Sequence, residues 1–363
     1  MKVKVIAKLN KRLWPSTKNT PLPNPHLPGD IIEVESEVEG EAPLNATNTR
    51  WYKAKGGYYV WSGGVLREDT VKIVEYDPDA FDWWHTRYSI REIWNKLGVR
   101  GEGVKIAVID TGVSLNHPAL VSKRNAPGKD YTNTTYGIDN FAHGTPVAGI
   151  IFAEAQSIGI APRASLYVVK IVDTGTFSAG TLLRALRGLP AGIDIVVISH
   201  AFPQGEFNHS LTADFIQAAS GKLIICGAGN YSNHNDSPVD YYPAALDGFI
   251  AVGACDRNNT IAYDSVKSNR IHLCAPGVDM KVINPFDHAN PMTGSGTSYA
   301  APFVAGIAAL MKSYCRKKSK PMSNAQLVTY LETTATKTSP NQNAQIYGAG
   351  IINPINAIKK ILP

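Results

Sequence analysis

A series of continuous apolar runs between residues 104 and 255 constrains the fold of this chain more than any other feature. The runs are KIAVIDTG, ASLYVVKIV, DIVVISHA, KLIICGAGN and FIAVGAC, and segments of helical composition such as TLLRALRGL and SLTADFIQAAS separate them. Strands that are apolar throughout, rather than alternating, are buried on both faces, as in a parallel sheet covered by helices. The pattern predicts an α/β domain whose functional site lies at the carboxyl ends of the strands.

The first seventy-odd residues have a different pattern, which predicts a small all-β domain over residues 1–74. IIEVESEVEGE alternates, as in a half-buried strand, with Ile32, Val34 and Val38 on one face and Glu33, Glu35, Glu37, Glu39 and Glu41 on the other. WYKAKGGYYVWSGGV places aromatic and β-branched residues on both sides of Gly56-Gly57, which predicts a hairpin. We expect a linker over residues 75–87, the α/β domain over 88–363, and a helix from Ile90 to Leu97 near its start.

Composition and charge narrow the class of protein. A chain of 363 residues, 44% of them hydrophobic, can bury a full core and is long enough for two domains. The net charge of +6 is mild, and the one basic run, residues 316–320, is expected to be a solvated loop, so we expect no nucleic-acid partner. The N-terminus has no continuous apolar stretch, which predicts no membrane span and a cytoplasmic protein, or a secreted one if the chain is a processed form.

The four cysteines, Cys226, Cys255, Cys274 and Cys315, are widely spaced and form no Cys-x-x-Cys pair. This spacing suggests neither a zinc site nor a dense disulfide framework. Free and mostly buried thiols are the favoured prediction, with a structural disulfide as the alternative.

Three polar residues, Asp110, His143 and Ser298, stand where a strand ends or a helix begins. Each has an ordinary structural interpretation: a turn residue or cap, a structural histidine, and a helix N-cap. Together they follow the order Asp, His, Ser in an α/β domain, with a glycine near each, and this is one known order of the acyl-transfer triad. Serine is a weak nucleophile until a neutral imidazole takes its proton, and the imidazole needs a carboxylate to fix its tautomer.

Two further residues near Ser298 bear on this prediction. Asn230 follows the apolar run LIICGAG and could be a turn residue, but its amide and the backbone N–H of Ser298 could together form an oxyanion hole. Pro302 is expected in the first turn of the helix that Ser298 opens, where a missing N–H is tolerated.

Four blocks, AVIDTGVSLNHP, HGTPVAGI, ICGAGN and GTSYAAPFVAGIAAL, resemble the signature blocks of the subtilisin-like serine peptidases (subtilases), in the same order. The resemblance covers about residues 88 to 363. It implies a three-layer fold with a mainly parallel sheet, the triad Asp110, His143 and Ser298, and Asn230 as oxyanion donor. It also implies that a protein or peptide substrate binds as an added strand. The substrate-binding residues would be Gly175 and Thr176 in one segment, Ser199, His200 and Ala201 in another, and Gly227 and Ala228 on the pocket wall.

The sequence departs from the family pattern at several positions. Pro146 replaces the second histidine of HGTHVAG, a change that should leave the base intact. Ala119 stands where secreted members often have a calcium-binding aspartate, and the loop AEAQSIGIAP is short, so we expect no high-affinity calcium site and no other metal or cofactor. His200, Ala201 and Phe202 replace a glycine-rich segment beside the first specificity pocket. These side chains either narrow and polarise the pocket or point into the core.

Residues 1–74 resemble bacterial SH3-like (SH3b) domains through VIAKLNKRLWPST, LPGDIIEVE and WYKAKGGYYVWSGGVL. The resemblance implies a protein or cell-wall ligand, and the alternative is a packing or inhibitory module without one. No inhibitory propeptide of the family is recognisable, so a role in positioning the protease on a partner is plausible.

The sequence therefore predicts a serine endopeptidase that acts through an acyl-enzyme on Ser298. The alternatives are a transpeptidase or macrocyclase that uses the same triad, and a catalytically silent binding protein built on a protease fold.

Overall fold

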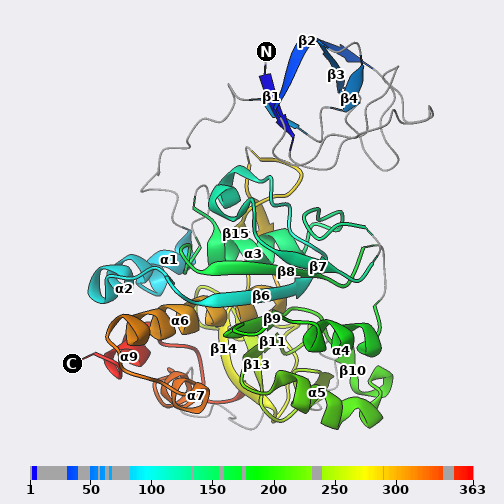
Figure 1. Ribbon diagram of the computed structural model, residues 1–363. Helices are drawn as coiled ribbons and strands as arrows, with labels where there is room; N and C mark the ends of the chain where they lie inside the picture. Colours follow the sequence, from blue (N-terminus) through cyan, green and yellow to red (C-terminus); the bar gives the residue numbers. More distant parts are fainter. Residues whose placement is uncertain are drawn as a thin grey trace. The chain divides into compact units, whose positions relative to one another are not determined.

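The computed structural model describes residues 2–5, 31–39, 50–55, 58–61, 65–67, 82–132, 134–154, 159–173, 177–230, 239–288, 290–337 and 347–362. The chain divides into two compact units, Met1–Glu75 and Tyr76–Pro363 (Figure 1). Several stretches discussed above lie outside the described residues: residues 6–17, 27–30 and 62–64 of the segments that resemble SH3-like domains, Glu41, Gly56-Gly57, residues 75–81 of the expected linker, residues 155–158 of the short loop, and Gly175 with Thr176.

The first unit contains an antiparallel sheet in the order β4-β3-β2-β1-β5. Its strands are β1 (Lys2–Val5), β2 (Ile31–Glu39), β3 (Arg50–Ala54), β4 (Tyr59–Trp61) and β5 (Val65–Arg67). The predicted alternation is confirmed in β2, where Ile32 and Val34 are buried and the glutamates from Glu33 to Glu39 are exposed. Strands β3 and β4 pair antiparallel, as the hairpin prediction requires.

The second unit is built on a seven-stranded sheet in which every pair of neighbours is parallel, in the order β14-β13-β11-β9-β6-β8-β7. The strands are β6 (Lys105–Asp110), β7 (Gly128–Asp130), β8 (Ser165–Lys170), β9 (Ile195–Ile198), β11 (Leu223–Gly227), β13 (Phe249–Cys255) and β14 (Ile271–Pro276). The five apolar runs are thus five of its strands, and the predicted parallel sheet is confirmed. Two short antiparallel ribbons accompany it, β10 (Phe202–Pro203) with β12 (Tyr241–Tyr242) and β15 (Met280–Val282) with β16 (Met292–Gly294).

Helices cover both faces of this sheet. From β6 the chain first reaches the edge strand β7 and then returns through α3 (Gly144–Phe152) to β8; it continues through α4 (Ala179–Arg187) to β9 and through α5 (Thr212–Ala219) to β11, on the other side of β6. Helix α3 packs against β6, while α4 and α5 pack against each other. The long helix α6 (Thr297–Lys317) packs against α3 and across β9, β11, β13 and β14 (Figure 1). The change of direction beside β6 is the switch point at which α/β proteins place their sites.

Shorter helices complete the second unit. They are α1 (Trp83–Arg87), α2 (Ile90–Leu97), α7 (Asn324–Thr333), α9 (Pro354–Lys359) and the 3-10 turns η3 (Pro118–Lys123), η4 (Gln204–Glu206) and η5 (His209–Leu211). The predicted helix from Ile90 to Leu97 is α2. Residues 83–87 of the expected linker form α1, which Asp82 caps through a capping box.

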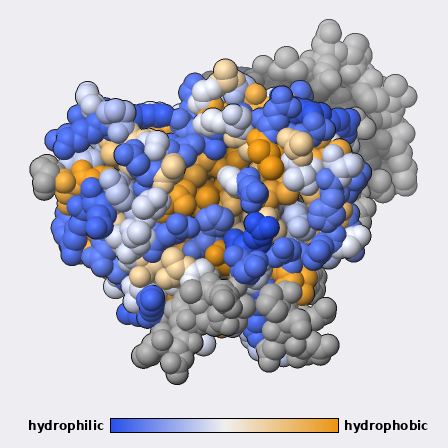
Figure 2. Space-filling view, turned by 90° about the horizontal axis from the view of Figure 1, so that it is seen from below, coloured by the Kyte–Doolittle hydropathy of each residue, from blue (hydrophilic) through white to orange (hydrophobic). Residues whose placement is uncertain are grey.

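Burial agrees with the apolar pattern. The strands β9, β11 and β13 are buried along their whole length, and all four cysteines are free and buried, which confirms the favoured thiol prediction. Figure 2 shows hydrophilic residues over much of one face, around a group of apolar residues near its centre. In the described part of the chain, no helix has the length and apolar character needed to cross a membrane.

The start of α6 differs from the prediction. The helix begins at Thr297 with Gly296 at the N-cap position, so Ser298 is its second residue and not its cap. Pro302 is therefore the sixth residue, beyond the first turn, where proline removes a hydrogen bond to the carbonyl four residues earlier. That carbonyl belongs to Ser298.

Candidate active site

Asp110 is the last residue of β6 and its side chain is buried. One oxygen, Oδ1, accepts hydrogen bonds from the backbone N–H of Thr111 and from Nδ1 of His143, both at 2.7 Å. Helix α3 approaches this strand end closely because Gly144 lacks a side chain: a Cβ there would lie 2.1 Å from the carbonyl oxygen of Gly112. The glycine beside His143 is thus a packing requirement for the contact between the imidazole and Asp110.

A second carboxylate, Asp139, fixes the start of α3. Its oxygens accept from the backbone N–H of Thr145 at 2.7 Å and from the hydroxyl of Thr111 at 2.8 Å. The Thr111 hydroxyl in turn accepts from the backbone N–H of Gly144 at 2.9 Å. Two orphan donors at the helix start are thereby satisfied, and His143, the N-cap residue, is held beside Asp110.

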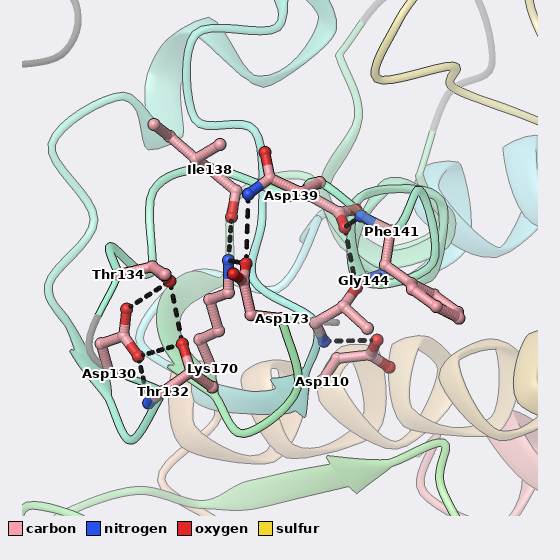
Figure 3. Close-up of polar contacts among 12 residues, drawn as sticks. Asp110, Asp130, Thr132, Thr134, Ile138, Asp139, Phe141, Gly144, Lys170 and Asp173 are labelled. Carbon is pink, nitrogen blue, oxygen red and sulfur yellow. Dashed lines mark hydrogen bonds and ion pairs between the residues drawn. The ribbon is translucent and has the colours of Figure 1, made fainter. Parts of the chain in front are cut away.

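Lys170, the last residue of β8, anchors the loop that leads to His143. This lysine is completely buried, pairs with Asp173 at 2.6 Å, and donates to the carbonyl of Ile138 at 3.1 Å (Figure 3). Figure 3 also shows Asp139 accepting from the backbone N–H of Phe141. Hydrogen bonds therefore hold both the first and the last residue of the segment from Ile138 to Phe141, and this limits the conformational freedom of His143, which follows it.

The electrostatics favour a charged carboxylate beside a basic imidazole. Burial raises the pKa of Asp110, but the imidazoles of His143 and His200 and the hydrogen bond from His143 outweigh burial, and the pKa lies below its ordinary value. Burial lowers the pKa of His143, but Asp110 outweighs it and leaves that pKa above its ordinary value. For His200 burial dominates and lowers the pKa. Burial has the opposite effect on the carboxyl group of Asp139, whose pKa it raises.

Ser298 and Ser199 are joined by two reciprocal hydrogen bonds. The hydroxyl of Ser298 donates to the carbonyl of Ser199, and the hydroxyl of Ser199 donates to the carbonyl of Ser298, both at 3.1 Å. The second bond satisfies the carbonyl that loses its helical partner at Pro302. Ser199 follows β9 directly, so this pair fixes the first turn of α6 to the carboxyl end of the sheet.

Asn230 lies beside the same helix start. Its Oδ1 accepts from the backbone N–H of Thr297 at 2.7 Å and from the Thr297 hydroxyl at 2.9 Å. With the carbonyl oxygen used twice, the Nδ2 group is left to donate elsewhere. A Cβ at Gly296 would lie 3.0 Å from that Nδ2 atom, so glycine at this position keeps the amide accessible.

The predicted substrate-binding residues occupy strand ends, as far as the structure describes them. Ser199, His200 and Ala201 follow β9, while Gly227 ends β11 and Ala228 comes next. The His200 ring does not point into the core: it lies half-buried, 5.1 Å between centroids from His143 and at right angles to Phe177. Of the segment that precedes Phe177, Gly175 and Thr176 lie outside the described residues.

Two residues and one interaction with structural roles in the site were not recognised in the sequence. Asp139 stands four residues before His143, a position from which it can accept from helix N–H groups, and that spacing was the available signal. Lys170 ends an apolar strand, and a lone lysine there indicates a buried partner. The tie between Ser199 and the Ser298 carbonyl had no local signal, because it depends on where α6 begins.

Comparisons with known proteins agree with this geometry. Residues 101–350 match the sequence model of the subtilase family. Subtilisin E of Bacillus subtilis (strain 168) is 33% identical over 299 residues, which cover 80% of this chain and 76% of that protein. An alkaline protease of Alkalihalobacillus alcalophilus is 35% identical over 307 residues, 79% of this chain and 73% of that protein.

Among solved structures, that of the prenylagaramide maturation protease PagA superposes with a TM-score of 0.64 at 26% identity, over 75% of this chain and 98% of that chain. With the matching family model and relatives above 30% identity, this chain belongs to the subtilase family of serine endopeptidases.

Proposed function

We propose that Ser298 is the nucleophile of this endopeptidase, with His143 as general base, Asp110 as its carboxylate partner and Asn230 as oxyanion donor. The observation that supports the proposal best is the 2.7 Å bond between His143 Nδ1 and the buried Asp110. An ionised carboxylate can only accept, so it fixes the proton on Nδ1 and leaves Nε2 as the basic nitrogen.

In the proposed reaction the Ser298 hydroxyl exchanges its bond to the Ser199 carbonyl for one to Nε2 of His143. The oxygen attacks the scissile carbonyl while its proton passes to Nε2, and Asp110 stabilises the resulting imidazolium. The oxyanion receives hydrogen bonds from Asn230 Nδ2 and from the backbone N–H of Ser298, which as the second residue of α6 has no helical partner. His143 then protonates the leaving amine. In the second half of the reaction His143 takes a proton from water, which attacks the ester, and returns that proton to the oxygen of Ser298.

A fluorophosphonate label tests the nucleophile. We expect the parent protein to take up one label per chain and Ser298→Ala to take up none. Ser295→Ala is the matched control, because Ser295 lies three residues away and its hydroxyl only accepts from the backbone N–H of Asp279. The proposal fails if the folded parent takes up no label, or if Ser298→Ala is labelled as well as the parent.

The same acyl-enzyme would also allow transpeptidation, in which an amine replaces water. The similarity to a structure named a maturation protease makes this alternative worth testing. Mass spectrometry of a cleaved peptide in the presence of an added amine separates the two: hydrolysis gives the free acid, and transfer gives the amide.

We further propose that the N-terminal unit is an SH3-like domain that places the protease on a protein or cell-wall partner. Its small antiparallel sheet with a compact apolar core supports the proposal. If residues 1–74 act in targeting, their deletion should slow cleavage of a native protein substrate while a short peptide is cleaved at the parent rate. Equal cleavage of both substrates by the two forms would exclude targeting.

A further inference from the structure

A second imidazole faces the carboxylate of the candidate site. His200 Nδ1 lies 3.7 Å from Asp110 Oδ2, the oxygen that His143 does not use. Both atoms are buried, and neither has a hydrogen-bond partner among the described residues. Unpaired buried polar atoms are rare because they lose hydration without compensation. Here a carboxylate oxygen and an imidazole nitrogen face each other without hydrogen bonds. A single ion between them that accepts an electron pair from each atom would satisfy both.

The third member of the group is His143. One ligand atom from each of Asp110, His143 and His200 can be chosen so that all three lie within 4.8 Å of one another. In a tetrahedral zinc site the metal–nitrogen and metal–oxygen distances of about 2.1 Å separate two ligand atoms by roughly 3.4 Å. The observed 3.7 Å between Asp110 Oδ2 and His200 Nδ1 is close to that separation.

Access and chemistry also suit a metal ion. The Asp110 side chain is 1% exposed, but those of His143 and His200 are 22% and 16% exposed, so an ion can enter from the imidazole side. Phe177 packs edge-on against His200, with ring centroids 5.0 Å apart, and limits the orientations of that ring. Two imidazoles and one carboxylate are a ligand set for Zn²⁺ and neighbouring transition metals, whereas Ca²⁺ and Mg²⁺ prefer oxygen ligands.

We propose that Asp110, His143 and His200 form an inhibitory binding site for a divalent transition-metal ion, with Zn²⁺ as the reference ion. Coordination through Nδ1 of His143 breaks its hydrogen bond to Asp110 and places the imidazole proton on Nε2. In that tautomer Nε2 is a donor and cannot accept the proton of Ser298. Metal binding and proton transfer thus exclude each other. The inhibition rests on the proposed function, but the binding site does not.

Binding is tested without catalysis in the full-length Ser298→Ala protein. We expect one Zn²⁺ per chain by isothermal titration, and visible absorption typical of tetrahedral Co²⁺ when Co²⁺ replaces it. Adding His200→Leu should weaken Zn²⁺ binding at least tenfold and remove the Co²⁺ absorption. His209→Leu is the matched control, because His209 packs edge-on against Phe207 and Tyr242 and is not a member of the group Asp110, His143 and His200, so it should leave binding unchanged.

Inhibition is measured in the active chain. Zn²⁺ should suppress peptide cleavage, a chelator should restore it, and Mg²⁺ at the same concentration should have no effect. The inhibition constant, taken against each variant's own metal-free rate, should rise at least tenfold in His200→Leu and stay the same in His209→Leu. His200→Gln, which keeps a polar side chain of similar size, should behave like His200→Leu and serves if the leucine variant does not fold.

Equal Zn²⁺ affinity in Ser298→Ala with histidine, leucine or glutamine at position 200 overturns the metal site. Failure of the proposed function looks different: the chain takes up no fluorophosphonate and cleaves no peptide, yet Ser298→Ala still binds Zn²⁺ through His200.

Discussion

The two ends of the candidate site differ in how their polar atoms are satisfied. At the nucleophile end, Ser298 and Ser199 bond reciprocally and Asn230 accepts twice from Thr297. At the carboxylate end, Asp110 uses one oxygen twice, while its other oxygen and Nδ1 of His200 have no hydrogen-bond partner in the described part of the chain. One end is held by completed hydrogen bonds, and the other has unused binding capacity.

The difference follows from what each end must do under the proposed mechanism. An oxyanion hole stabilises charge best when its donors are fixed in advance, so the groups around Ser298 and Asn230 should be rigid. The carboxylate needs only one oxygen to orient His143, and the second is available for another interaction. The four predictions below test the two ends separately, in order of expected effect.

The largest effect is expected at the carboxylate end from Asp110→Asn. An amide in place of the carboxylate no longer fixes the Nδ1–H tautomer of His143, so kcat should fall by about 10⁴-fold, the order measured for this change in a chymotrypsin-type protease and for loss of the triad aspartate in subtilisin. Peptide cleavage under saturating substrate is the measurement. Asp139→Asn is the comparison: it alters the carboxylate that fixes the start of α3 but leaves Asp110 to orient the imidazole, so its loss of kcat should be smaller. A loss under tenfold in Asp110→Asn would contradict the assignment.

The next effect is expected at the nucleophile end from Asn230→Ala. Loss of the Nδ2 donor should lower kcat by about 100-fold to 1000-fold, a magnitude taken over from subtilisin, and should change KM little because the bond forms in the transition state. Asn230→Asp keeps the acceptor for Thr297 but lacks the donor, so it should lose activity to a similar degree. Full activity in either variant would remove Asn230 from the oxyanion hole.

The pH dependence of kcat/KM tests the pairing of His143 with Asp110. The base must be neutral to accept the serine proton, and Asp110 holds the pKa of His143 above its ordinary value of 6.5. Activity should therefore rise with pH, about tenfold per unit at low pH, and level off through an apparent pKa above 6.5. The contribution of His143 to the free energy of unfolding should change in the opposite direction. It is complete below pH 6.5, where the imidazole is charged, and is lost as the pH rises through the folded-state pKa. A midpoint of activity below 6.5 would contradict the pairing.

Sequence patterns predicted the architecture well for a physical reason. Apolar strands such as β9 and β11 and the alternation in β2 are local signals of burial, and the sheet followed from them. The same logic predicted that Asp110 and His143 stand at a strand end and a helix start, and the structure places them there. Their chemical roles, and that of Ser298, stay a prediction until they are measured.

The parts that sequence could not predict depend on distances between segments far apart in the chain. Whether His200 lines a pocket or enters the core was open, because its orientation is set by packing against Phe177 and His143. The position of Pro302 was predicted wrongly, because α6 begins one residue earlier than Ser298 and its N-cap is a glycine without a capping side chain. A helix start without a polar cap has no local signature.

The smallest effect is expected from Ser199→Ala, which removes the hydroxyl that satisfies the Ser298 carbonyl. The carbonyl then lacks both this partner and the helical N–H that Pro302 cannot supply, so the free energy of unfolding should fall by about 1–3 kcal/mol. In a Pro302→Ala background the N–H of residue 302 can bond to the same carbonyl, so Ser199→Ala should cost less there. Denaturant unfolding of the parent, both single variants and the double variant measures this difference as a coupling energy. Equal costs of Ser199→Ala in the two backgrounds would show that Ser199 does not replace the bond lost at Pro302, and the rigidity of the nucleophile end would need another source.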